Sequence, residues 1–308
     1  MLTLFAVPKP FRGHIGTIQR NAIRSWLALR PRCQVILFGD EEGLAEVADT
    51  FGVQHVADVA RNEFGTPLLN DVFTQAERLA TTDVICYVNS DIIFAGGFTE
   101  AVNTIRRRTQ RFLIVGECWN LDITEPLDFT KTDWGKSLAR VALQKGKRRG
   151  RWWIDYFVFP KGLYESLPPF ALGRAGYDNW LVWKARNLKA TVVDVTRAVI
   201  AVHQNHDYSH VSGGLQYTQK GEEARRNLTL AGGQEHLYRI DDATHRLTPA
   251  GLRRNLGAYI RWEYRKPRVK ARINHFWWWL VELTRPGRHR VGLRMATLQK
   301  LKTRLIRD

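Results

Sequence analysis

Three small polar residues interrupt an apolar run in CYVNSDIIF, residues 86–94. The strand that this run predicts ends near Val88, so Asn89, Ser90 and Asp91 lie at or just beyond its carboxyl end. Ligands of parallel sheets collect at that edge. Oxygen-bearing side chains two residues apart can serve a hard divalent cation such as Mg²⁺ or Mn²⁺. A turn capped by Asp91 is the structural alternative.

A histidine cluster follows a later apolar run, in AVIAVHQNHDYSH, residues 198–210. Three histidines and an aspartate within eight residues are more than a simple turn requires, which favours a ligand or phosphate-contact role for His203. We expect less of His206 and His210. A core histidine bonded to a backbone carbonyl is the alternative, and a zinc hydrolase lacks support because no HExxH pattern or cysteine partner accompanies the cluster.

Two further aspartates lie where predicted elements meet. Asp178, in GRAGYDNWLVW (173–183), begins a predicted helix, where it is either a reactive carboxylate or an N-cap. Asp40 ends the predicted strand QVILFGD (34–40), where a turn is the alternative to a binding role.

Strands and helices alternate along the first two thirds of the chain, which predicts a Rossmann-like α/β domain with a mostly parallel sheet flanked by helices. The segment 117–150, charged and without periodicity, predicts a loop. The expected strands are 2–7, 34–38, 53–56, 84–94, 112–115, 153–159 and 190–202, and the expected helices 15–29, 44–51, 67–80, 99–107 and 177–186.

Other segments are placed near a ligand by their order in the chain. PKPFRGHIG (8–16) joins the first strand to its helix, where the helix start and Arg12 favour phosphate oxygens. RWWIDYFVF (151–159) brings aromatic faces beside a carboxylate, a combination suited to sugars, and a buried aromatic core is the favoured alternative.

Together these motifs resemble the glycosyltransferases of the GT-A fold, over roughly residues 2–210. The Asp-x-Asp motif of that family corresponds here to Asn89-Ser90-Asp91, with the first aspartate replaced. The resemblance implies Asp178 as catalytic base, and Asp91 and His203 as ligands of Mn²⁺ or Mg²⁺. It also implies donor contacts from Pro8, Arg12, Asp40, Asn70, Asn89 and Ser90, and acceptor contacts from Trp153 and Asp155.

The implied reaction is transfer of a sugar from a nucleotide-diphosphate sugar to an acceptor hydroxyl, with inversion, in glycan or polysaccharide synthesis. Two alternatives remain open. One is a basic nucleic-acid-binding protein, which is disfavoured because the core contains no recognisable RNA- or DNA-binding motif. The other is a GT-A-like protein that binds nucleotide-sugar without turnover, which Asn89 suggests.

The composition limits the partners and the location. The net charge of +17 indicates an anionic partner, such as nucleic acid, acidic lipid headgroups or phosphorylated small molecules. We expect a catalytic domain over 1–210 and a basic, aromatic-rich and mainly helical extension over 211–308, whose tail is suited to an anionic membrane surface. Three isolated cysteines and the absence of a leader-like or membrane-spanning run predict a cytoplasmic protein with reduced thiols, peripheral to the inner face of the membrane.

Overall fold

The computed structural model describes residues 2–207, 213–265 and 274–276. The chain forms two compact units, residues 1–253 and 254–308. Among the described residues, no helix is both long enough and apolar enough to cross a bilayer. His210 and most of the basic tail lie outside the described residues.

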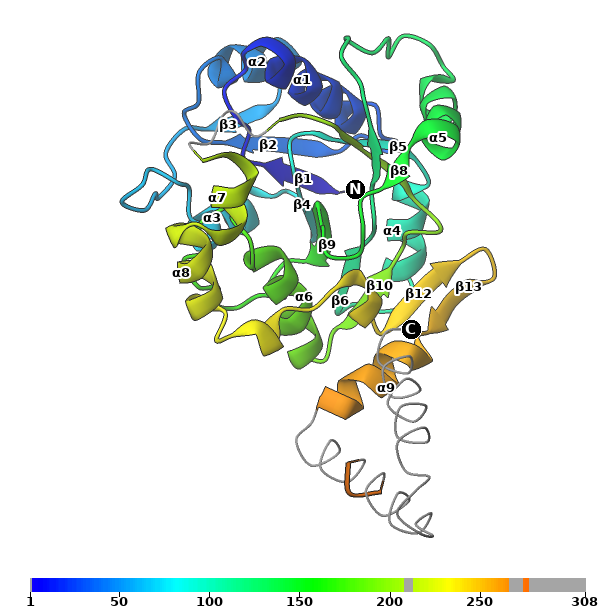
Figure 1. Ribbon diagram of the computed structural model, residues 1–308. Helices are drawn as coiled ribbons and strands as arrows, with labels where there is room; N and C mark the ends of the chain where they lie inside the picture. The colour runs from blue at the N-terminus through cyan, green and yellow to red at the C-terminus, as the bar shows by residue number, and fades with distance from the viewer. Residues whose placement is uncertain (1, 208–212, 266–273, 277–308) are drawn as a thin grey trace, which may run out of the picture. The chain divides into compact units, whose positions relative to one another are not determined.

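A large, mostly parallel sheet forms the centre of the first unit (Figure 1). Within the described residues its nine strands run in the order β13-β12-β10-β6-β9-β4-β1-β2-β3. Strand β9 is antiparallel to both β4 and β6. The strands are β1 Thr3–Ala6, β2 Gln34–Phe38, β3 Gln54–Val56, β4 Val84–Val88, β6 Phe112–Val115, β9 Tyr156–Pro160, β10 Thr191–Asp194, β12 His245–Thr248 and β13 Gly251–Arg254.

A smaller sheet has the order β5-β11-β7-β8. It consists of β5 Ile92–Gly96, β7 Trp119–Leu121, β8 Lys147–Arg148 and β11 Ile200–Gln204. Strands β5 and β11 are antiparallel and place His203 opposite Ile92, after a shift of register between Ile200 and Ala201. Between β4 of the large sheet and β5 of the small one, the linking residues are Asn89, Ser90 and Asp91.

Helices flank the large sheet (Figure 1). In α1 the apolar residues Ile18, Ala22 and Trp26 repeat at helical spacing, and all three are buried. The helices of the first unit are α1 Gly13–Leu27, α2 Leu44–Phe51, α3 Leu69–Leu79, α4 Phe98–Arg106, α5 Trp134–Lys145, α6 Tyr177–Asn187, α7 Gly214–Lys220, α8 Glu222–Leu230, and the short 3₁₀ turns η1 Gln234–His236 and η2 Ile240–Asp242. Helix α9 Leu256–Arg265 belongs to the second unit.

The predicted α/β class, with a mostly parallel central sheet between helices, is confirmed. The three cysteines are free and buried, as expected. The first compact unit extends to residue 253, beyond the boundary predicted at residue 210, because β12 pairs with β10 and carries Leu247 into the core.

Three local predictions are wrong. The expected strand 190–202 is two strands, β10 in the large sheet and β11 in the small one. The run 84–94 is two strands in different sheets, since the polar triplet forms a tight turn in which the Ile92 amide donates to the Asn89 carbonyl. The expected loop 117–150 contains helix α5, whose Leu138 and Ala142 pack against the smaller sheet. Their spacing of four residues was a helical signal that the surrounding charges obscured.

Candidate active site

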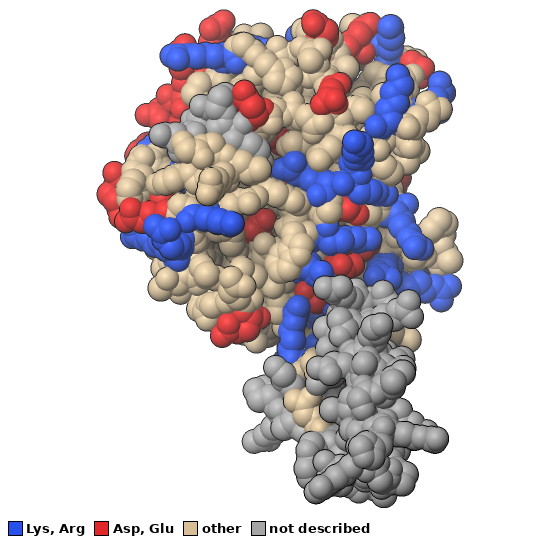
Figure 2. Space-filling view, in the orientation of Figure 1, with Lys and Arg blue, Asp and Glu red and all other residues tan. Residues whose placement is uncertain are grey.

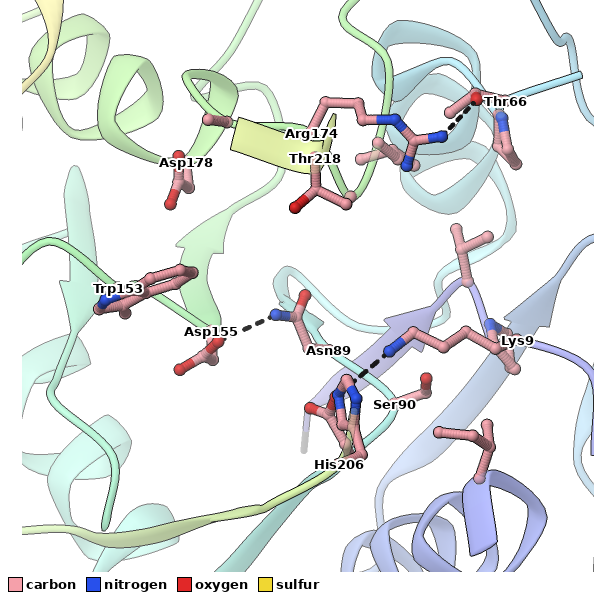
Figure 3. A pocket seen from close by; sticks show the side chains of 18 of the residues that line it. Lys9, Thr66, Asn89, Ser90, Trp153, Asp155, Arg174, Asp178, His206 and Thr218 are labelled. Atoms are coloured by element: carbon pink, nitrogen blue, oxygen red, sulfur yellow. Dashed lines mark hydrogen bonds and ion pairs between the residues drawn. The ribbon is translucent and has the colours of Figure 1, made fainter. Parts of the chain in front are cut away.

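A cavity of about 1440 Å³ opens at the carboxyl ends of β1 and β4. Pro8 and Lys9 follow β1, and the polar triplet follows β4. Because β9 is antiparallel, Asp155 reaches the same edge from the start of that strand. The first turn of α6 adds Asp178 from across the cavity (Figure 3).

Asp91, His203 and His206 converge at one end of this cavity. Each offers a ligand atom, and these atoms lie within 4.8 Å of one another. His206 Nε2 is 3.1 Å from Asp91 Oδ2, and His203 Nε2 is 3.9 Å from the same oxygen. Asp91 Oδ1 and His203 Nε2 are buried without a hydrogen-bond partner in the described structure. The cluster contains a second histidine, His206, of which the sequence led us to expect little.

The charges in this cluster are set by burial and by each other. Burial alone would raise the pKa of Asp91, but His203, His206 and Lys9 around it hold that pKa well below its usual range. Burial lowers the pKa of His203 to about 4, so its ring is neutral at pH 7. An ionised carboxylate beside the neutral imidazole of His203 and the ring nitrogen of His206 is a donor set that accepts a divalent ion such as Mn²⁺, whereas Mg²⁺ favours oxygen donors. The residues therefore fit the metal that the resemblance implies.

The two imidazoles differ in which nitrogen can bind an ion. Arg149 contacts His203 Nδ1 at 3.0 Å, and because arginine only donates, that nitrogen accepts. The proton of neutral His203 is then on Nε2, the nitrogen that faces Asp91. His206 directs Nδ1 at the Asp207 carbonyl and Nε2 at Asp91 Oδ2, 3.1 Å away. Its Nε2 is closer to the carboxylate than His203 Nε2, which makes Asp91 and His206 the closer pair.

Buried amides hold Asp91 in place. Gln204, fully buried, donates through Nε2 to the carbonyls of Asp91 and Ile18, at 3.0 and 2.7 Å. The hydroxyl of Ser90 donates to Gln19 Oε1 at 2.8 Å. Side chains of α1 and β11 therefore fix the backbone that carries the carboxylate, as preorganised metal or phosphate sites require.

Asn89 does not join the metal cluster. Its amide donates to Asp155 Oδ1 at 3.1 Å (Figure 3), and Asp155 Oδ2 forms an ion pair with Arg149 Nε at 3.1 Å. The Arg149 guanidinium also stacks over Trp153, 4.8 Å from the ring centre. The predicted acceptor residues Trp153 and Asp155 thus line the cavity, but the carboxylate of Asp155 holds other side chains.

Asp178 lies in the first turn of α6 and is half-buried in the cavity wall. Burial raises its pKa to about 7, against the backbone hydrogen bonds of the helix start, which lower it. Its Oδ1 has no hydrogen-bond partner among the described residues. The helix is capped by Gly176 and has no side-chain cap, so the N-cap alternative for Asp178 fails. A carboxylate that titrates near neutrality can accept a proton from a bound hydroxyl.

No family model and no curated protein matches the sequence. Among solved structures, the mannosyltransferase PcManGT from Pyrobaculum calidifontis, with GDP-Man and Mn²⁺, is similar at 13% identity and TM-score 0.43, over 68% of this chain and 58% of that one. Glucosyl-3-phosphoglycerate synthase from Mycobacterium tuberculosis, with Mg²⁺ and UDP, gives 14% and 0.43, over 76% and 80%. TarS from S. aureus, with UDP-GlcNAc, gives 12% and 0.46, over 68% and 60%.

The predicted donor residues divide into two groups. Pro8, Arg12, Asn89 and Ser90 line the cavity, whereas Asp40 and Asn70 are not among its lining residues. Asp40 is exposed and ion-paired with Arg61, which lines the cavity instead. Asn70 lies within α3 and does not line the cavity. The order of segments along the chain was therefore not enough to place this side chain at the donor site.

Arg174 ties the loop before Asp178 to helix α8. Its Nε donates to Glu223 Oε2 at 2.7 Å and its Nη2 to Thr66 Oγ1 at 3.2 Å. Asn62 donates to the other Glu223 oxygen at 2.7 Å. Glu223 is only 1% exposed, so this ion pair is desolvated on the carboxylate side. The pair fixes the wall of the cavity from which Asp178 projects.

We expect Glu223→Gln to destabilise the protein by about 2–4 kcal/mol, because loss of one partner leaves the Arg174 charge without its carboxylate. Urea unfolding of both proteins measures the difference. The neighbouring Glu222 is exposed, so Glu222→Gln is the matched control and should change stability by less than about 0.5 kcal/mol. Equal effects of the two substitutions would show that the buried ion pair contributes nothing particular.

Proposed function

We propose that the protein is a metal-dependent glycosyltransferase that moves a sugar from a nucleotide-diphosphate sugar to an acceptor hydroxyl. One observation carries this proposal: Asp178, a half-buried carboxylate with a pKa near 7, lines the same cavity as the Asp91 and His206 pair. A base near one end and a cation site near the other are what displacement of a diphosphate by a hydroxyl requires.

Asp91 and His206 would hold the ion, and His203 would join them if Arg149 left its Nδ1. When bound, the ion supplies positive charge against the diphosphate of the leaving group. Pro8, Arg12, Asn89 and Ser90 border the space proposed for the donor. Asp40 and Asn70 require a different arrangement of the chain to reach it.

Asp178 would take the proton of the acceptor hydroxyl as that oxygen attacks the anomeric carbon. A single displacement of this kind inverts the configuration at that carbon. Trp153 lies on the cavity wall, where its ring face is suited to a sugar of the acceptor. Asp155 would act beside it mainly by holding Asn89 and Arg149 in position. A glycan acceptor is consistent with the size of the cavity.

Activity should rise with pH and level off above about pH 7, because Asp178 is competent as a base only after it loses its proton. The measurement is kcat/KM from pH 5.5 to 8.5 at constant metal concentration. A profile that is flat between pH 6 and 8 would remove Asp178 from this role.

Stability should follow the opposite course. The folded-state pKa of Asp178 lies above its unfolded value, so its contribution to stability is complete below about pH 4 and is lost as the pH rises through 7. Asp178→Asn removes the titrating group. The variant should therefore equal or exceed the wild type in stability at pH 8, by up to about 4 kcal/mol, which thermal unfolding at pH 5 and pH 8 can measure.

The nucleic-acid alternative gains no support from the face shown in Figure 2 or from the cavity. On the face in Figure 2, acidic side chains are interspersed among the basic ones, unlike the uninterrupted basic stripe of a nucleic-acid site. In the cavity, Arg12, Arg61 and Arg174 are paired with carboxylates. The proposed contact of the tail with an anionic membrane falls largely on residues outside the described ranges.

The donor is tested by thermal unfolding against a panel of nucleoside diphosphates and nucleotide-sugars, each with and without Mn²⁺. One nucleotide should stabilise the wild type, and only with the metal. Binding followed by no transfer to any hydroxyl acceptor would favour the alternative of a nucleotide-sugar-binding protein without turnover.

A further inference from the structure

Lys9 places a positive charge directly against the proposed metal ligands. It follows β1 and lines the cavity (Figure 3). Its Nζ is 3.2 Å from His206 Nε2 and 3.8 Å from Asp91 Oδ2. Lysine ammonium groups are strongly hydrated and ordinarily extend into solvent. Here the side chain is only 27% exposed, so the fold holds the ammonium at this position at a cost in hydration.

The backbone of Lys9 is fixed relative to the polar triplet. Gln19, on α1 and fully buried, accepts from the Lys9 amide at 2.7 Å and donates to the Lys9 carbonyl at 2.8 Å. The same Gln19 oxygen accepts from Ser90, the neighbour of Asp91. One buried amide therefore sets the distance between the lysine and the carboxylate.

The atoms around the ammonium form a compact polar cluster. Lys9 Nζ lies within 3.8 Å of both His206 Nε2 and Asp91 Oδ2, which are 3.1 Å from each other. The second carboxylate oxygen, Asp91 Oδ1, is buried without a hydrogen-bond partner in the described structure. A buried carboxylate attracts a positive group, and either the Lys9 ammonium or a divalent ion can supply it.

We propose that Lys9 is a second cation of the donor site, which shares Asp91 and His206 with the metal ion and contacts the diphosphate when both are bound. This inference rests on the proposed glycosyltransferase function. Lys9 lowers the affinity for metal alone, by repulsion and by competition for the same acceptors. A diphosphate gives the ammonium another anionic partner, so metal and diphosphate favour each other's binding, and the coupling is reciprocal.

Lys9→Met tests this with effects of opposite sign. The variant should bind Mn²⁺ alone about tenfold more tightly, because a like charge within 4 Å of the ligands is gone. It should bind UDP or GDP, whichever the wild type binds, about tenfold more weakly because one charge-assisted contact is lost. Calorimetric titrations of Mn²⁺, of the diphosphate, and of each in the presence of the other measure both affinities and their coupling.

Two variants serve as controls. Lys9→Arg keeps the charge and should retain weak binding of metal alone. Lys220→Met removes an exposed lysine that also lines the cavity, and should leave the affinity for metal alone unchanged. Thermal unfolding shows that each variant is folded.

The outcomes separate this inference from the proposed function. Unchanged affinities in Lys9→Met, or weaker binding of both metal and diphosphate in a folded variant, would overturn the role of Lys9, since the second result marks a lysine that merely supports Asp91. Absence of any nucleoside diphosphate binding by the wild type, with or without Mn²⁺, would instead overturn the proposed function itself.

Discussion

Asp178→Asn is expected to lower kcat by about 10²- to 10⁴-fold, the range that loss of a general base produces. The amide has the shape of the carboxylate but cannot accept the proton of the acceptor hydroxyl. Binding of the nucleotide-sugar should change by no more than a few-fold, because the proposed donor contacts lie around Asp91, across the cavity. Single-turnover assays and donor titrations separate the two quantities.

Asp122→Asn is the matched control for that experiment. Asp122 also lines the cavity, but it is exposed and bonded to Asn205. Its substitution should leave kcat within a few-fold of the wild type. If Asp178→Asn turned over at a similar rate, the acceptor proton would have to leave by another route and the assignment of the base would be wrong.

Asp91→Ala is expected to abolish the stabilisation that nucleoside diphosphate and Mn²⁺ together give the wild type. At a ligand concentration of 100 times Kd that stabilisation is about 2.7 kcal/mol, or a rise in Tm of about 5 °C for a chain of this size. The alanine variant should show no metal-dependent rise. Thermal unfolding with and without Mn²⁺ measures it.

The substitution itself affects stability, because it leaves Lys9 and His206 without their carboxylate. Asp91→Asn keeps the shape and should also lose the metal-dependent rise, which separates ligation from packing. His203→Gln should have the smaller effect, since Arg149 occupies its Nδ1. A full metal-dependent rise in both Asp91 variants would place the metal elsewhere or remove it from the proposal.

The sequence was most informative where local chemistry contradicted its surroundings. Asn89, Ser90 and Asp91 could be recognised because a polar triplet in an apolar run has few structural reasons to exist. Asp178 could be placed at a helix start by its glycine and the apolar residues after it. Both predictions depend only on neighbouring residues in the sequence. They therefore do not require knowledge of which distant segments pack together.

Contacts between distant segments of the chain could not be predicted from these local patterns. Arg149 lies in the charged segment 117–150 that the sequence predicts as a loop, but it contacts His203, Asp155 and Trp153. Lys9 was passed over beside Pro8, because nothing in PKPFRG indicates that Gln19 clamps it from α1. Pairings of this kind depend on which segments fold together, and spacing along the chain does not contain that information.

The pairing register of β5 and β11 makes the position of His203 depend on the number of residues in β11. His203 lies opposite Ile92 only because the register shifts between Ile200 and Ala201. Successive side chains of a strand alternate between faces, so the deletion of one residue upstream in β11 would turn His203 away from Asp91. Evolution of this site is therefore constrained by insertions and deletions as much as by substitutions: relatives with the same function should keep the number of residues in this strand fixed, even where every apolar position in it has changed.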